Sequence, residues 1–98
     1  MDQLTRIQEM EDIYREASAV LPALQAALDA YALLRPRLAE LETYYTSPLW
    51  RADYAADEAG ILSPDLPRGV LSEDGVWNLL TDHRSLLEQF ADLAQNQQ

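Results

Sequence analysis

Five acidic residues and one arginine lie close together in the middle of the sequence. In chain order they are Asp53, Asp57, Glu58, Arg68, Glu73 and Asp74. Residues three or four positions apart share one face of a helix, so Asp53 and Asp57 would lie on the same side. Two such carboxylates could hold a hard cation or accept hydrogen bonds from an arginine. Because Arg68 is the only base between Ala52 and Asp74, we expect it to pair with Asp53 or Asp57 and fix the loop.

The catalytic alternative for these carboxylates is a metal-dependent phosphohydrolase-like helical enzyme. Such enzymes carry acid-x-x-acid pairs on adjacent long helices. Glu9 and Asp12 have that spacing, whereas Asp53 and Asp57 do not. Charges on a helix are usually solvated or paired. We therefore expect structural ion pairing, and we predict no catalytic residue, no metal ligand and no cofactor.

Aromatic residues surround the same segment. Tyr44, Tyr45, Trp50 and Tyr54 lie within eleven positions, and Trp77 follows later in the chain. They could fill the junction between helices as a small core, or they could anchor a partner protein, since Trp, Tyr and Arg are favoured at interface hot spots. We expect the small core, and the two roles are compatible.

His83 is the only histidine, and it lies among apolar residues at helical spacing. No serine or cysteine in the chain has the pattern of a catalytic nucleophile paired with a histidine. We therefore interpret His83 as structural, and an enzyme is the less favoured class.

These residues need helices to position them. From Leu4 to Tyr45, apolar residues recur every three or four positions, close to a heptad repeat, which predicts one amphipathic helix over 3–45. Pro22 and Pro36 lie inside this pattern without a capping residue before them, so we expect kinks rather than new helix starts. The apolar stripe could be a coiled-coil surface for a partner. We favour packing against the C-terminal helix of the same chain.

The rest of the chain contains clear signals for helix ends. Ser47 and Pro48 predict the start of a short helix over 48–58, which Gly60 ends. Three breakers in 61–71 predict an ordered loop. Ser72 then opens a C-terminal helix over 73–94, with Glu73 and Asp74 in its first turn, where the helix dipole favours acids.

We therefore predict an all-α fold that forms a single domain over 1–98. It is a small helical bundle with a long, Pro-kinked N-terminal helix, a short middle helix and an antiparallel C-terminal helix. Leucine and alanine dominate the sequence, and β-branched residues are few, which favours helices over sheets.

One run of residues resembles a known family. It comprises Tyr44-Tyr45, Ser47, Trp50, Asp53-Tyr54, Ala56-Asp57-Glu58-Ala59-Gly60, Leu66 and Arg68-Gly69-Val70-Leu71-Ser72-Glu73-Asp74. These residues are similar to the signature of the bacterial domain-of-unknown-function family 4298, from which Leu49 is a departure. The resemblance extends over nearly the whole chain. It implies a small, helical, bacterial protein and no established activity.

The net charge and the absence of cysteine exclude several classes of function. The 98 residues carry a net charge of −10 and contain no cysteine. Acidity excludes a nonspecific nucleic-acid binder, and the absence of cysteine excludes disulfides and thiol nucleophiles. We see no targeting segment and no uninterrupted apolar run of about 20 residues, so we expect a cytoplasmic protein with no membrane association.

The favoured function is an acidic protein–protein interaction or regulatory module, with a protein partner or a homodimer formed through the long helix. The alternatives are the metal-dependent enzyme and an acidic mimic of nucleic acid, which would line its acids along one exposed face. The candidate binding or structural residues are Tyr44, Tyr45, Trp50, Asp53, Tyr54, Asp57, Glu58, Arg68, Ser72, Glu73 and Asp74.

Overall fold

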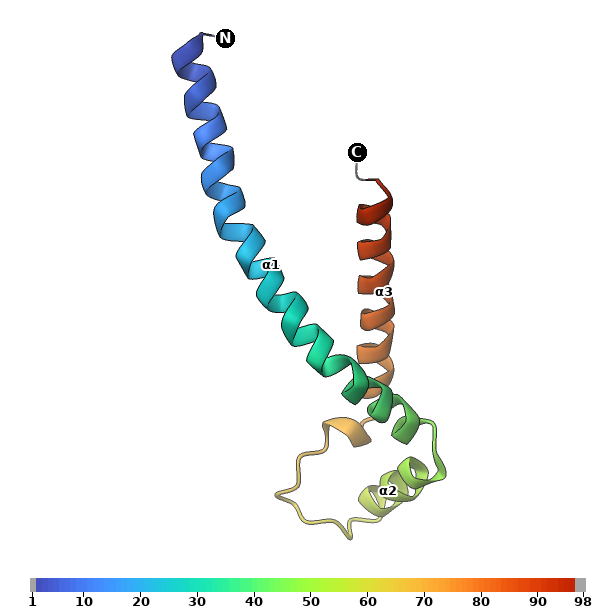
Figure 1. Ribbon diagram of the computed structural model, residues 1–98. Helices are drawn as coiled ribbons and strands as arrows, with labels where there is room; N and C mark the ends of the chain where they lie inside the picture. Colours follow the sequence, from blue (N-terminus) through green and yellow to red (C-terminus); the bar gives the residue numbers. More distant parts are fainter. Residues whose placement is uncertain (1, 97–98) are drawn as a thin grey trace. The chain divides into compact units, whose positions relative to one another are not determined.

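The computed structural model describes residues 2–96, and they form an all-α fold without strands. Figure 1 shows its elements in chain order. They are α1 (Gln3–Tyr45), α2 (Pro48–Glu58), a single 3₁₀ turn η1 (Gly69–Leu71) and α3 (Gly75–Gln95). The predicted fold class is confirmed, with one long, one short and one C-terminal helix.

The chain divides into two compact units, Met1–Leu38 and Ala39–Gln98. The described part of the first unit is almost entirely a single helix, the first 36 residues of α1. The carboxylate of Asp2 caps this helix by accepting a hydrogen bond from the Thr5 amide at 2.7 Å, which lowers the pKa of Asp2. Pro22 and Pro36 lie inside α1 and do not divide it.

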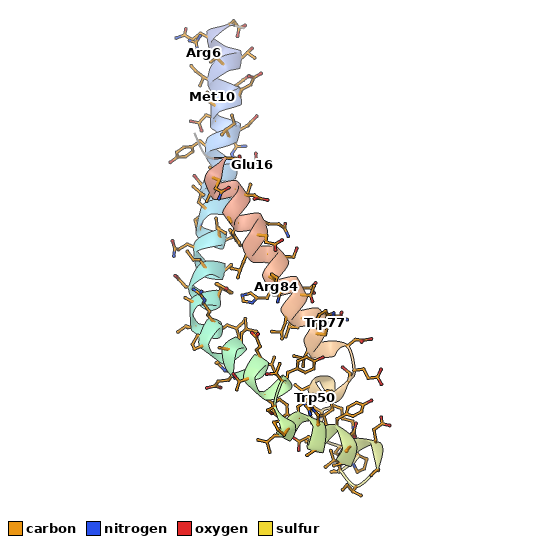
Figure 2. The ribbon with its side chains drawn as sticks, turned by 90° about the vertical axis from the view of Figure 1, so that its right-hand side faces the viewer. Arg6, Met10, Glu16, Trp50, Trp77 and Arg84 are labelled. Atoms are coloured by element: carbon orange, nitrogen blue, oxygen red, sulfur yellow. The ribbon has the colours of Figure 1, made fainter. Side chains whose placement is uncertain are left out.

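The apolar face of α1 is exposed in the first unit, and none of the residues of α1 is buried. Figure 2 shows side chains such as those of Arg6, Met10 and Glu16 projecting outward from the helix. We define the α1 stripe as the six large apolar residues at near-heptad spacing in this unit. They are Ile7, Met10, Tyr14, Leu21, Leu24 and Leu28, and each is between 46% and 70% exposed.

A single helix cannot cover its own stripe, so its apolar surface must find another partner. The antiparallel packing of the C-terminal helix on the first one stays a prediction. By length and composition alone, α1 is also apolar enough to cross a membrane, a test that core helices of soluble proteins and signal sequences pass as well.

The second unit begins with the last turns of α1 and continues into α2. The hydroxyl of Ser47 accepts a hydrogen bond from the Trp50 amide at 3.4 Å, and Pro48 occupies the first turn. At the other end, Gly60 adopts a φ of 74°, and its amide bonds to the Asp57 carbonyl at 3.0 Å. The Ile61 amide bonds to the Ala56 carbonyl at 3.2 Å, which completes a Schellman motif.

Two buried residues form the core of this unit. Leu71 in η1 is 6% exposed, and Val76 in the first turn of α3 is 3% exposed. The turn η1 contacts both α2 and α3, so a three-residue turn lies at the centre of the unit. Because this core is small, the structure of the unit depends strongly on the hydrogen bonds around η1.

The start of α3 differs from the prediction. The helix begins at Gly75, so Glu73 and Asp74 precede it instead of lying in its first turn. Ser72 still acts at this end, because its hydroxyl accepts a hydrogen bond from the Gly75 amide at 3.0 Å. The physical reason is that residues 69–71 form the 3₁₀ turn, and the chain needs the next three residues to turn into the helix axis.

Candidate functional site

Trp50 occupies the centre of the aromatic group, in the first turn of α2. Its ring packs edge-on against Tyr45 with a centroid distance of 5.1 Å, and it stacks on Tyr54 at 5.2 Å. Its indole N–H donates to the Val70 carbonyl at 2.7 Å. One side chain thus connects the end of α1, the length of α2 and the turn η1. None of these three aromatic side chains is buried, and the expected small aromatic core stays a prediction.

Tyr44 and Asp53 connect α1 to α2 beside that ring stack. The Tyr44 hydroxyl donates to Oδ2 of Asp53 at 2.6 Å. This hydrogen bond to a carboxylate raises the pKa of Tyr44 to about 12, because ionising the phenol would remove the donor. Asp53 therefore bonds to Tyr44 and not to Arg68, for which it was one of the two expected partners.

Tyr54, the residue after Asp53 on α2, also donates to a carboxylate. Its hydroxyl donates to Oε1 of Glu73 at 2.9 Å. The hydrogen bond to Glu73 is the main cause that raises the pKa of Tyr54 to about 12, and the nearby charge of Glu58 adds to it. Glu73 comes from the segment just before α3, so this pair holds the C-terminal helix to α2.

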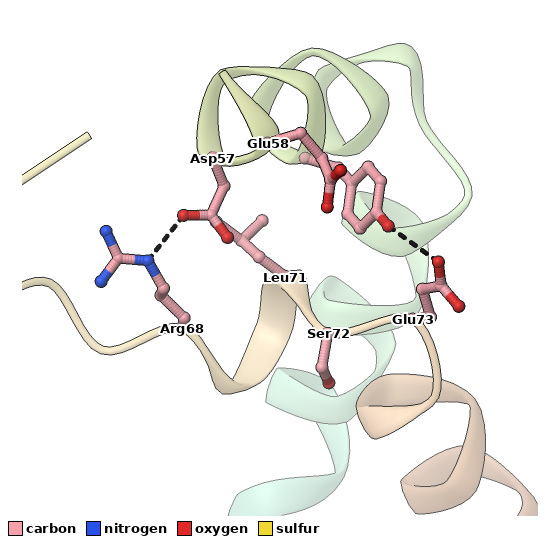
Figure 3. A pocket seen from close by; sticks show the side chains of 7 residues that line it. Asp57, Glu58, Arg68, Leu71, Ser72 and Glu73 are labelled. Carbon is pink, nitrogen blue, oxygen red and sulfur yellow. Dashed lines mark hydrogen bonds and ion pairs between the residues drawn. The ribbon is translucent and has the colours of Figure 1, made fainter. Parts of the chain in front are cut away.

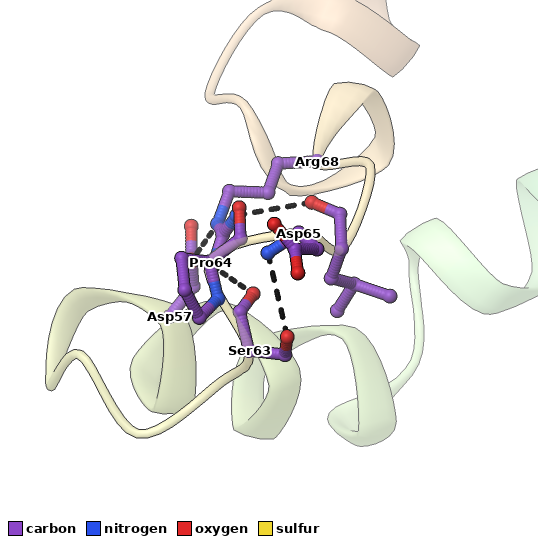
Figure 4. A network of polar contacts seen from close by, with 6 residues as sticks. Asp57, Ser63, Pro64, Asp65 and Arg68 are labelled. Carbon is purple, nitrogen blue, oxygen red and sulfur yellow. Dashed lines mark hydrogen bonds and ion pairs between the residues drawn. The ribbon is translucent and has the colours of Figure 1, made fainter.

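Arg68 pairs with Asp57, the other expected partner, through a bond of 2.6 Å from Nε to Oδ1. Figure 4 shows that the rest of the guanidinium turns toward its own loop. It donates to the carbonyls of Ser63 at 2.7 Å, Leu66 at 3.0 Å and Pro64 at 3.2 Å. Arginine suits this position because its planar fork can reach several acceptors at once.

The hydroxyl of Ser72 joins the turn η1 to the start of α3. Ser72 donates to the Gly69 carbonyl at 2.9 Å and accepts from the Gly75 amide. A Cβ atom at Gly75 would collide with the Ser72 hydroxyl and would lie 2.7 Å from the Gly69 carbonyl oxygen. Close approach of the backbone therefore explains Gly75, a residue for which the sequence offered no reason.

A shallow hollow of about 390 Å³ opens between α2 and the loop. It is lined by Tyr54, Asp57, Glu58, Arg68, Leu71, Ser72 and Glu73. Figure 3 shows that Asp57 and Glu73 turn toward their partners Arg68 and Tyr54. The structure thus brings six of the candidate residues to one hollow, but most of their polar groups are engaged in internal bonds.

The carboxylates do not assemble into a cation site. Among residues 2–96, no three His, Cys, Asp or Glu side chains form a group that could hold a metal ion. On α2, Asp53 accepts from Tyr44 and Asp57 accepts from Arg68. The side chain of Asp74 makes no capping bond to α3. The condition that the metal-dependent enzyme required, at least three converging carboxylates, is not met by these residues.

A second groove, of about 260 Å³, lies where the end of α1 meets α3. It is lined by Glu42, Tyr45, Thr46, Trp77, Leu80, Thr81, His83, Arg84 and Leu87. Trp77 is 60% exposed at this groove, so it stays outside the ring stack of Trp50. The sequence grouped Trp77 with the other aromatic residues, whereas the ring contacts of Trp50 are with Tyr45 and Tyr54.

Sequence reasoning missed four acceptors in this network, the carbonyls of Ser63, Pro64, Leu66 and Val70. Backbone acceptors have no residue-type signal, so only an unsatisfied donor such as an arginine or an indole could have suggested them.

The model of one protein family, Domain of unknown function (DUF4298), matches residues 7–93. The match includes the α1 stripe, the whole bonded network from Tyr44 to Gly75 and most of α3. No curated protein and no solved structure matches the chain.

Proposed function

The chain belongs to the family of the Domain of unknown function (DUF4298), and from this premise we propose that it acts as a protein–protein interaction module. The observation that carries the proposal is the exposed α1 stripe. Contiguous apolar surface of this extent on a protein usually marks a site of association. A helix that presents such a face binds other helices or a hydrophobic groove.

The pattern around the stripe supports a helical partner surface. Two more large apolar residues, Ile13 and Val20, lie one position before Tyr14 and Leu21 of the stripe, and both are exposed. These residues widen the apolar face beyond the two positions of a strict heptad seam. The partner therefore presents apolar side chains over more than a narrow line.

The second unit supports the same proposal by the way its polar groups are used. Arg68 bonds to four acceptors, Ser72 bonds on both sides, and Tyr44 and Tyr54 donate to carboxylates. These bonds build a junction that stabilises the ends of α1 and α3. A catalytic site needs groups that can turn to a substrate, so a role in holding helices is better supported.

An acidic mimic of nucleic acid has less support than an interaction module. Residues 3–38 contain five acids and four arginines. The arginines interrupt the row of negative charge that a basic nucleic-acid site would require.

The test is affinity capture of the full chain from the cells that produce it. The variant Leu21→Asp/Leu24→Asp places two charges on the stripe. The matched control Ala19→Asp/Ala26→Asp places the same charges on the opposite face of α1. We expect specific co-purifying chains, whether other proteins or tagged and untagged copies of this one, with the wild type and the control but not with the stripe variant. Identical capture by all three would refute the proposal.

We also propose that the protein works in the cytoplasm. The charged residues Arg6, Glu9, Glu11, Asp12 and Arg15 in the first half of α1 support a helix in water. Cell fractionation is the test, with the native chain expected in the soluble fraction after high-speed centrifugation. Recovery with the membranes, resistant to high salt and alkaline carbonate, would contradict it.

A further inference from the structure

The repeat and the charges of α1 together indicate what covers its stripe. We propose that the partner is a second copy of this chain, and that the two α1 helices pair in antiparallel orientation over residues 7–38. This inference rests on the proposed function and specifies its partner.

The repeat is that of a helix that packs along another helix. Ile7, Tyr14, Leu21 and Leu28 lie seven residues apart, and Met10, Ala17 and Leu24 lie three residues after the first three of them. This is the alternation of three and four residues over more than three heptads that defines a helix–helix seam. The six large members are all exposed, so the seam is available.

The charge distribution selects the orientation. Residues 3–20 contain four acids and two arginines, a net charge of −2, whereas residues 21–38 contain one acid and two arginines, a net charge of +1. A parallel pair would place the two acidic halves together. An antiparallel pair places each acidic half against a basic half, and it also aligns the helix dipoles favourably.

One register of the antiparallel pair satisfies the seam and the charges together. When Leu21 faces Leu24 of the second copy, Leu28 faces its Ala17. Tyr14 then faces its Tyr31, so apolar residues meet in every layer of the seam between positions 14 and 31. In the same register Arg35, which interrupts the apolar repeat, faces Met10 of the second copy. Glu9 and Glu11 of the second copy flank that position, so the arginine meets acids at the edge of the seam.

The first experiment measures the mass of the purified full chain by sedimentation equilibrium over a wide concentration range. We expect twice the chain mass of 11.1 kDa. The variant Leu21→Ala/Leu24→Ala keeps a high helix propensity and should raise the dissociation constant by roughly 100-fold, because each chain loses two contact leucines. The control Ala19→Asp/Ala26→Asp should remain a dimer, and circular dichroism at a concentration at which all three proteins are dimers should show equal helix content.

The second experiment determines orientation by electron–electron spin distances. The chain has no cysteine, so the variants Gln8→Cys and Ala23→Cys each accept a single nitroxide label. In the antiparallel register, the labels at position 8 of the two copies lie roughly 45 Å apart along the axis, and the labels at position 23 lie at nearly the same height. A parallel pair would bring both pairs of labels within about 20 Å, since paired helix axes are about 10 Å apart.

The outcomes separate this inference from the proposed function. A monomer at every concentration, or a short distance at position 8, overturns the antiparallel pair. If the chain is a monomer while capture from cells still depends on the stripe, the interaction module stands with a different partner. If the chain is a monomer and capture is also insensitive to the stripe, both proposals fail.

Discussion

Arg68 illustrates how a single residue can organise a loop in a unit where two apolar side chains are buried among the residues that the structure describes. It joins α2 through Asp57 and takes up three carbonyls of the segment 63–66. These carbonyls lie in the loop and outside the helices, and the guanidinium satisfies them, that of Ser63 together with a bond from the Leu66 amide at 3.2 Å. The side chain is 34% exposed, and its value lies in the number of acceptors it serves.

The change Arg68→Lys should therefore lower stability although it keeps the charge. A lysine can retain one bond to Asp57 but cannot reach the three carbonyls in the same plane. We expect a loss of about 1–2 kcal/mol in the free energy of unfolding, measured by urea denaturation. The control Arg51→Lys, also on α2, should change it by less than about 0.5 kcal/mol. Equal losses would show that the fork has no special role.

Tyr44 and Tyr54 predict how the second unit responds to alkaline pH. Their hydrogen bonds to Asp53 and Glu73 raise both pKa values from 10 to about 12. A raised pKa in the folded state means that the bonds stabilise the fold fully below pH 10, and that this contribution is lost as the pH rises through 10 to 12. We expect the free energy of unfolding to fall over this window in the wild type.

The double variant Tyr44→Phe/Tyr54→Phe should start from a lower stability at pH 8 and decline less between pH 10 and 12. Tyr14→Phe, which removes an exposed tyrosine of the α1 stripe, provides the control and should follow the wild-type slope. Parallel curves for all three proteins would contradict the assignment.

At the scale of elements, the joint between η1 and α3 depends on Gly75. Alanine is ordinarily the better helix former by about 1 kcal/mol. Here its methyl group would collide with the Ser72 hydroxyl and the Gly69 carbonyl, so either the Ser72 bond to the helix breaks or the turn shifts. The cost of crowding then exceeds the gain in propensity.

We expect Gly75→Ala to lower the free energy of unfolding by about 1–3 kcal/mol, the usual cost of overpacking. Gly69→Ala is the matched control, because nothing lies within 4 Å of the Cβ position there. Thermal denaturation followed by circular dichroism compares the two. A Gly75→Ala variant at least as stable as the wild type would show that the turn tolerates the methyl group.

The long helix α1 contains two residues whose intrinsic helix propensity is unfavourable. Pro22 and Pro36 each remove a backbone donor inside α1, at a cost of about 3 kcal/mol in a helix interior. The helix continues through both positions. Such a helix needs contacts along its apolar face to offset this cost, which agrees with a partner on the α1 stripe.

For the whole molecule, the two units should respond differently to protein concentration. If α1 is stabilised by a second copy, opening of residues 7–31 requires dissociation, and its amides should exchange with deuterium more slowly as concentration rises. The network from Tyr44 to Gly75 is internal to one chain, so its exchange should not change. Hydrogen-exchange mass spectrometry measures both regions in the same sample.

The variant Leu21→Asp/Leu24→Asp should remove the concentration dependence from residues 7–31 and leave the second unit unaffected. Concentration dependence in neither region would argue against self-association. Dependence confined to the second unit would place the contact between copies elsewhere.

The sequence by itself determined the helices, because the signals for them are local. The apolar period, the serine–proline start at residues 47–48 and the glycine stop at Gly60 act within one or two turns of the chain. The helices α1 and α2 occur at these signals, whereas α3 begins two residues later than expected. The pairing of Arg68 with an acid on α2 could also be predicted, since one base lay among many acids.

Only the tertiary structure decided which groups meet across the loop. Arg68 pairs with Asp57 rather than with Asp53. Tyr44 donates to Asp53 and Tyr54 donates to Glu73. The indole N–H of Trp50 donates to the Val70 carbonyl. Gly75 is explained only by the oxygen atoms that approach it. The physical reason is that these contacts depend on the path by which residues 59–74 return to α2, and a non-periodic loop does not encode its path in the spacing of its residues.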